Sequence, residues 1–234
     1  MSDRTQMILP NPTEMRIGFV SDHVTHILAD AATRHKILRV GQHAQSLVRQ
    51  GVQVQWIAST DTAEALATNA HLVAAGDEGL PATCRHVLPC QPYDFEGVQL
   101  LCLTPSLWQD PALQTRLFTF LCLLQQARPC HLWHAWGSLA AAYMTVYTAR
   151  FLGISAVVSD IVPALDADPQ QGFVWQWVAQ HTSRAVVDRA AERQLWLSTG
   201  AVSAAQIEII DSASPEYVDT LINVYQRLHS LVAL

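Results

Sequence analysis

Short apolar segments alternate with longer amphipathic segments along most of this chain, and this alternation limits its fold more than any other feature. Arg16–Ser21 is apolar up to a polar end, which is typical of a strand buried in a parallel sheet. A helix predicted over His35–Arg49 has one apolar face and ends at Gly51, and Val52–Ile57 follows as the next strand. The same unit recurs toward the C-terminus, which predicts an α/β fold with helices on both faces of a parallel sheet.

The other elements follow from the same periodicities and predict one Rossmann-like domain over residues 16–234. Its sheet has about six or seven strands, and a capped amphipathic helix at about 215–232 closes it. Residues 1–15 are expected to form a flexible N-terminal tail, because Pro10 and Pro12 favour an extended chain. Further strands are predicted over Cys84–Leu88, Val98–Leu103, His131–His134, Ser155–Ser159, Arg184–Val187 and Gln206–Ile210, and further helices over Asp61–Ala75, Pro111–Arg128, Ser138–Leu152 and the rest of 170–198.

Composition excludes several classes of protein. Half of the 234 residues are apolar and 15% are charged, which suits a buried core and argues against disorder. A net charge of −6 argues against nucleic-acid binding. The five cysteines form no CxxC pair, and the N-terminal segment has no secretory pattern, so we expect reduced thiols and a cytoplasmic protein. No apolar run is long enough to span a membrane, although peripheral contact with one stays an alternative.

Polar residues that follow predicted strands are the candidates for chemistry, because ligands of such sheets bind at the carboxyl ends of the strands. Asp22 follows the first strand and suits a catalytic base, with a cap of its own loop as the alternative. His134 ends a later strand and suits a catalytic contact with an acceptor hydroxyl, with a core histidine as the alternative. The predicted acceptor cleft also includes His23, Trp136, Gly137 and Asp160.

The sequence favours neither a metal site nor a bound cofactor. His131 and His134 are three residues apart in a predicted strand, so their side chains point to opposite faces of the sheet. His23 and His26 have the same spacing, which is unlike that of helical or cysteine-based metal sites. The chain also lacks the glycine-rich fingerprint of dinucleotide-binding proteins and the P-loop of nucleotide-binding proteins.

Val40–Val54, His134–Gly137, Val186–Gly200 and Ile207–Ile210, together with the final helix, resemble the N-terminal half of family-4-type glycosyltransferases of the GT-B fold. The resemblance implies that this half binds an acceptor, while a second domain of such enzymes binds the nucleotide-sugar. That second domain has no room here, because the chain passes almost directly from Ile210 to the closing helix. Trp136 also replaces the second His of the family's HxHG motif, and no Gly-Gly pair follows the first strand.

Aromatic and basic residues near the predicted cleft suggest two kinds of partner. Trp175 and Trp177 lie in a strongly apolar segment, so we expect them to form a surface for a protein partner or for self-association. Arg34, His35, Lys36 and Arg39 form a basic cluster that suits a phosphate, as in relatives that act on lipid-linked acceptors; the alternative is a solvated helix face.

Two functional hypotheses follow. In the first, the chain is a glycosyltransferase-related single-domain protein that is inactive alone and acts as a binding or assembly subunit through its cleft face. In the second, it is the acceptor-binding subunit of a split two-protein glycosyltransferase, binds a sugar or lipid-linked acceptor, and transfers a hexosyl group only with a separate donor domain. The lost motif residues favour the first hypothesis, but fold resemblance by itself does not establish chemistry.

Overall fold

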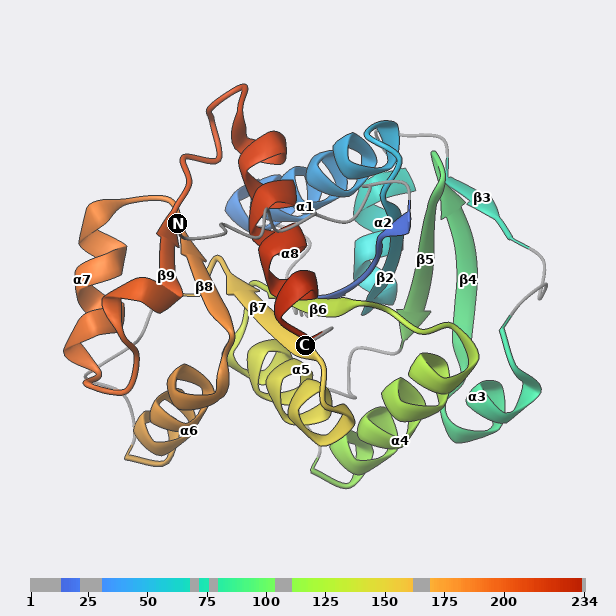
Figure 1. Cartoon of the computed structure of the whole chain (residues 1–234). Coiled ribbons are helices and arrows are strands. Elements are labelled where there is room, and N and C mark those ends of the chain that lie inside the picture. The colour runs from blue at the N-terminus through green and yellow to red at the C-terminus, as the bar shows by residue number, and fades with distance from the viewer. Residues whose placement is uncertain are drawn as a thin grey trace, which may run out of the picture.

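A nine-stranded sheet forms the centre of the protein in the computed structural model, which describes residues 14–21, 31–67, 72–75, 80–103, 111–161 and 169–232. The strands lie in the order β3-β4-β5-β2-β1-β6-β7-β8-β9 (Figure 1). Their bounds are β1 Arg16–Ser21, β2 Gln53–Ser59, β3 Leu72–Ala74, β4 Cys90–Phe95, β5 Val98–Leu103, β6 Leu132–Trp136, β7 Ser155–Ser159, β8 Arg184–Val187 and β9 Ile207–Ile209.

The sheet is parallel except where β4 pairs antiparallel with both β3 and β5. The chain runs outward from β1 through β2 in one direction and from β6 through β9 in the other, so the strand order reverses between β1 and β6. This confirms the predicted α/β, Rossmann-like architecture. In sheets of this kind the reversal places a crevice at the carboxyl ends of the strands.

Helices cover both faces of the sheet (Figure 1). Side chains alternate between the faces, so Phe19 belongs to the core under one helical layer and Val20 to the core under the other. The first layer contains α1 (Ala31–Arg49), α2 (Thr60–Ala67) and α8 (Tyr217–Val232). The second contains α3 (Ala82–Val87), α4 (Pro111–Ala127), α5 (Leu139–Leu152), α6 (Pro169–His181) and α7 (Ala190–Ser198).

The predicted closing helix is present as α8. Leu221, Val224, Tyr225 and Leu228 are buried at helical spacing, and this stripe packs against α1 and the sheet. Glu216 donates its backbone N–H to the Ser214 hydroxyl at 3.2 Å, just before the helix begins. Burial of this apolar stripe therefore holds the last helix of the chain on the sheet.

Three sequence predictions differ from the structure at the β3–β4–β5 edge and at the N-terminus. Cys84–Leu88, predicted as a strand, forms most of α3, and Leu72–Ala74, predicted as helix, is the strand β3. β3 and β4 (Cys90–Phe95) are strands that the sequence did not predict, and the sheet has nine strands in place of the expected six or seven. Met15, expected in the flexible tail, is fully buried, and its carbonyl accepts a hydrogen bond from the Gln53 N–H.

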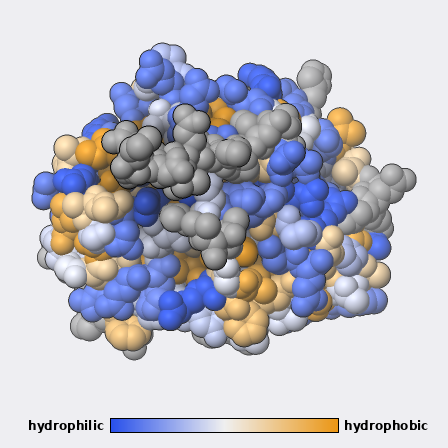
Figure 2. All heavy atoms as spheres, in the orientation of Figure 1, coloured by the Kyte–Doolittle hydropathy of each residue, from blue (hydrophilic) through white to orange (hydrophobic). Residues whose placement is uncertain are grey.

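The surface carries hydrophobic side chains in scattered patches. In the view of Figure 2 they are interspersed with hydrophilic residues. Among the described residues, the large hydrophobic side chains that are exposed to solvent are Val73, Tyr147, Phe151, Phe173 and Ile209. None of the helices in the described part of the chain has both the length and the hydropathy needed to cross a membrane.

Candidate functional site

Charged side chains meet at the carboxyl ends of β7 and β8, where Arg39 of α1 reaches across the sheet edge. Its guanidinium pairs with the carboxylate of Asp160, which follows β7, and with that of Asp188, which follows β8, at 3.2 Å. It also donates to the Ser212 hydroxyl at 3.1 Å, and that hydroxyl donates to Asp188 at 2.8 Å. One arginine thus ties α1 to the ends of two strands and to the segment that follows β9.

This network is partly buried, which sets its electrostatics. The Arg39, Asp160 and Asp188 side chains are 23%, 14% and 24% exposed. Burial opposes the charge of Arg39, but the hydrogen bond to Asp160 and the two nearby carboxylates outweigh it and raise the Arg39 pKa. The cation therefore stays charged and is already balanced by two anions.

A cavity of about 610 Å³ opens beside this network, and we call it the carboxyl-edge cavity. Its rim holds exposed residues that supply both donors and acceptors of hydrogen bonds, a mixture that suits a polar ligand of low net charge. The lining consists of His35, Arg39, Gln42, His43, Asp188, Arg189, Asp211, Ser212 and Ala213.

His43 forms the inner wall of this cavity. It is 6% exposed, stacks on Tyr217 with ring centroids 4.2 Å apart, and lies against Trp136 at 5.5 Å. Burial, assisted by the nearby positive charge of Arg39, lowers the His43 pKa to about 4. The ring is therefore neutral at neutral pH, and its buried Nδ1 has no hydrogen-bond partner among the described residues.

His134, the predicted catalytic residue, lies beneath α8 with no exposed surface. Its Nδ1 is 2.5 Å from the Tyr225 hydroxyl and its Nε2 is 2.7 Å from the Ser159 hydroxyl, so both ring nitrogens are hydrogen-bonded. Burial keeps its pKa well below the usual value. This is the geometry of a core histidine, the alternative that the sequence left open. A catalytic role stays a prediction that this geometry does not support.

The other predicted cleft residues fall in different environments. Trp136 is 1% exposed and stacks on His134 at 4.2 Å, so it belongs to the core behind His43. Gly137 has φ 92° and donates to the Ser159 carbonyl, which ends β6 in a turn that favours glycine. Asp160 is the predicted cleft residue that joins the Arg39 network. Asp22 and His23 lie outside the described residues.

The two tryptophans predicted to form a partner surface point to opposite sides of α6. Trp175 is buried at 4% exposure against Trp196, so it offers little surface to a partner in this structure. Trp177 is half-buried and packs beside Tyr143 and Tyr147 of α5. The part of this surface that is open belongs to residues the sequence did not single out, such as Phe173, at 69% exposure.

Several residues of the carboxyl-edge cavity are polar and follow a strand, which is the pattern that singles out Asp160 in the sequence. Asp188 and Ser212 follow strands as Asp160 does, so the rule that selected Asp160 also selects them. His43 has no such signal, because it lies inside a helix. Within the parts of the chain that the structure describes, no group of three or more His, Cys, Asp or Glu residues could hold a metal ion.

Comparison with known proteins identifies structures that share the fold but no protein with a similar sequence. No family profile and no curated protein sequence matches the chain. Among solved structures, the Anabaena protein HepE, in complex with UDP and glucose, matches with a TM-score of 0.50 at 15% identity, covering 90% of this chain and 51% of HepE. The UDP-N-acetylglucosamine 2-epimerase from Rickettsia bellii matches with a TM-score of 0.57 at 8% identity, covering 90% of this chain and 48% of the enzyme.

A further match is the UDP-GlcNAc 2-epimerase from Methanocaldococcus jannaschii, with a TM-score of 0.53 at 9% identity over 90% of this chain and 53% of the enzyme. The chain therefore spans about half the length of the structures it matches. At such low identity the likeness concerns the fold alone: this protein has the architecture of one half of GT-B-type proteins.

Proposed function

We propose that this protein is a binding subunit derived from the acceptor-side half of a GT-B glycosyltransferase. It has no sugar-transfer activity alone and grips a protein partner, or a second copy of itself, through the carboxyl-edge cavity. One observation carries the proposal: only residues 210–216 lie between β9 and α8, so no nucleotide-sugar domain interrupts the fold at that point.

The electrostatics of the cavity support a binding role over a catalytic one. Arg39 is engaged by Asp160, Asp188 and Ser212, and burial keeps His43 neutral. Neither of these groups has the pKa near neutrality that a general acid or base needs. The exposed rim, which includes His35 and Gln42, offers polar contacts of the kind found at the edges of protein interfaces.

Titration with nucleotide-sugars tests the proposal that the protein has no sugar-transfer activity alone. We expect no saturable heat when UDP-glucose, UDP-N-acetylglucosamine or a GDP-sugar is added to the purified protein in a calorimeter. Micromolar binding of any of them would mean that a donor site exists on this chain, and the proposal would then be wrong.

Photo-crosslinking tests the proposal that a partner binds at the carboxyl-edge cavity. A photoreactive amino acid replaces Gln42, which is exposed on the cavity rim, and a matched protein carries it at Gln126, exposed on α4 in the opposite helical layer. We expect one discrete crosslinked species from position 42 at the native expression level, identified by mass spectrometry as a partner or as a second copy. Equal crosslinking from both positions, or none from position 42, contradicts a role for this face.

The alternative is an acceptor-binding subunit of a split glycosyltransferase. The observation that favours it is the survival of two carboxylates, Asp160 and Asp188, at the edge where an acceptor hydroxyl would approach. It predicts sugar transfer from a nucleotide-sugar only when the crosslinked partner is also present. In that complex, Asp188→Asn should lower transfer without weakening assembly, whereas an assembly subunit gives no transfer with either protein.

A further inference from the structure

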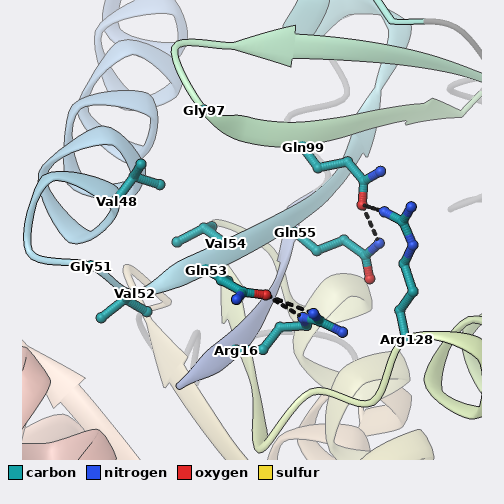
Figure 3. Close-up of a pocket in the computed structure, with 10 residues that line it drawn as sticks. All are labelled: Arg16, Val48, Gly51, Val52, Gln53, Val54, Gln55, Gly97, Gln99 and Arg128. Atoms are coloured by element: carbon teal, nitrogen blue, oxygen red, sulfur yellow. Dashed lines mark hydrogen bonds between the residues drawn. The ribbon is translucent and has the colours of Figure 1, made fainter. Parts of the chain in front are cut away.

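A second cavity, of about 340 Å³, lies at the opposite edge of the sheet, where β1, β2 and β5 begin (Figure 3). We call it the amino-edge cavity. The crevice expected for this type of fold is at the carboxyl ends of the strands, so the fold alone does not account for a ligand site here. Its lining comprises Arg16, Val48, Gly51, Val52, Gln53, Val54, Gln55, Gly97, Gln99 and Arg128.

Two arginines give this cavity its charge. Arg16 begins β1 and donates through its guanidinium to the side-chain oxygen of Gln53 at 2.9 and 2.6 Å. Arg128 follows α4 and donates to the side-chain oxygen of Gln99 at 2.5 Å. None of the described residues that line the cavity is Asp or Glu, although the whole chain has 20 acidic and 14 basic residues. The lining is therefore positively charged in a protein that is negatively charged overall.

Gln55 adds a buried acceptor to the cavity. Its side-chain NH₂ donates to Gln99 at 2.7 Å, while its oxygen is buried and has no hydrogen-bond partner among the described residues. The residue is 3% exposed. The Gln99 oxygen already accepts from both Gln55 and Arg128, so turning the Gln55 amide round would set two oxygens against each other. The unpaired oxygen is thus fixed in place, between the two arginine side chains (Figure 3).

We propose that the amino-edge cavity binds a small phosphate monoester that carries a hydroxyl group. A phosphate monoester has nearly two negative charges at neutral pH, which match the two guanidinium groups of Arg16 and Arg128. Planar guanidinium groups bind phosphate oxygens through paired N–H donors. When the two arginine side chains turn toward the phosphate, the Gln55 oxygen between them becomes accessible to the ligand. A hydroxyl group on the same ligand can then donate the hydrogen bond that this oxygen lacks.

The size of the cavity selects a small molecule over a macromolecule. A volume of about 340 Å³ lies at the lower end of the range for small-ligand pockets. The net charge of −6 disfavours a polyanion such as nucleic acid, which binds to extended basic surfaces. Gly51 and Gly97, both in the lining, contribute no side chains to fill the cavity.

Calorimetric titration with four probes separates the parts of this ligand. Glycerol 3-phosphate carries both the phosphate ester and hydroxyls, methyl phosphate and inorganic phosphate lack the alcohol hydroxyl, and glycerol lacks the charge. We expect saturable binding of glycerol 3-phosphate, binding of the other two phosphates that is weaker by about tenfold, and none of glycerol. Equal affinity for all three phosphates overturns the assignment of the hydroxyl to Gln55, and no saturable binding of any phosphate overturns the site.

Matched variants locate the binding. Arg16→Gln and Arg128→Gln should each weaken glycerol 3-phosphate by about tenfold or more, because each removes charge-assisted hydrogen bonds. Arg49→Gln, at an exposed position outside the lining, is the control and should bind as the wild type does. Gln55→Leu should bind glycerol 3-phosphate no better than methyl phosphate. Circular dichroism and thermal unfolding check that each variant is folded.

The pattern across variants decides the outcome. Wild-type affinity in both Arg16→Gln and Arg128→Gln, or an equal loss in Arg49→Gln, places the ligand elsewhere and contradicts the proposal. These results are independent of whether the carboxyl-edge cavity binds a partner, because no residue lines both cavities.

Discussion

The two edges of the sheet use arginine in opposite ways. At the carboxyl edge, Arg39 is surrounded by Asp160, Asp188 and Ser212, so its charge is balanced within the fold. At the amino edge, Arg16 and Arg128 donate to the neutral amides of glutamines, in a cavity whose described lining contains no carboxylate. The first arrangement places carboxylates around the arginine, whereas the second places two arginines in a lining that has no described carboxylate. An arginine therefore indicates an anion site only after its partners are known.

The largest expected effect is a pH dependence at the carboxyl edge. The folded-state pKa of His43, about 4, lies below its ordinary value of 6.5, so the unfolded chain binds the proton more readily. Stability is therefore complete above pH 6.5 and is lost as the pH falls toward 4. A shift of this size corresponds to about 3 kcal/mol in the free energy of unfolding. Urea unfolding of the wild type and of His43→Phe, measured across this pH range, should show that the free energy of unfolding falls less in the variant than in the wild type.

The comparison needs a control, because buried His134 has a lowered pKa and acts in the same direction. His86→Phe removes an exposed histidine on α3 and should keep the wild-type pH dependence. If His43→Phe and the wild type lose stability in parallel between pH 6.5 and 4, the balanced network does not exclude the proton from His43.

A smaller effect distinguishes the arginines directly. Arg39→Met keeps most of the apolar part of the side chain but leaves two partly buried carboxylates without their cation. We therefore expect the free energy of unfolding to fall by about 2 kcal/mol. Arg16→Met leaves only a neutral amide without its partner and should cost less than about 1 kcal/mol. Urea unfolding at neutral pH measures both. Asp160→Asn should restore part of the loss in the Arg39→Met background, and similar costs for the two arginine variants would remove the distinction between the edges.

The central part of the fold is predictable from sequence, and its edge is not. β1, β6 and β7 are buried on both faces, which gives continuous apolar runs that sequence periodicity detects. β4 is mostly half-exposed, and Pro92 and Asp94 within it weaken its strand signal. It pairs with β5 through a tight turn in which Glu96 and Gly97 both have positive φ, and no apolar pattern marks such a hairpin.

The candidate site was predictable only where a local rule applies. Asp160 follows a strand, and its place at the carboxyl edge follows from that position alone. The burial of His134 depends on Tyr225, which is 91 residues away in the sequence and reaches it only because α8 folds back onto the sheet. The basic cluster that includes Arg39 suggested a phosphate site, but the two carboxylates that neutralise Arg39 follow strands far along the chain. Such long-range pairs leave no local pattern in a single sequence.

The smallest expected effect is a gain in stability at the amino edge. Gln55→Leu removes a buried oxygen that has no partner among the described residues, together with one hydrogen bond to Gln99. Relief of the unpaired oxygen and burial of an apolar side chain outweigh the lost bond, so we expect stability to rise by about 1 kcal/mol. Thermal and urea unfolding without added phosphate measure this gain. A loss of similar size would show that the Gln55 oxygen is already satisfied in the free protein, and the amino edge would then be as balanced as the carboxyl edge.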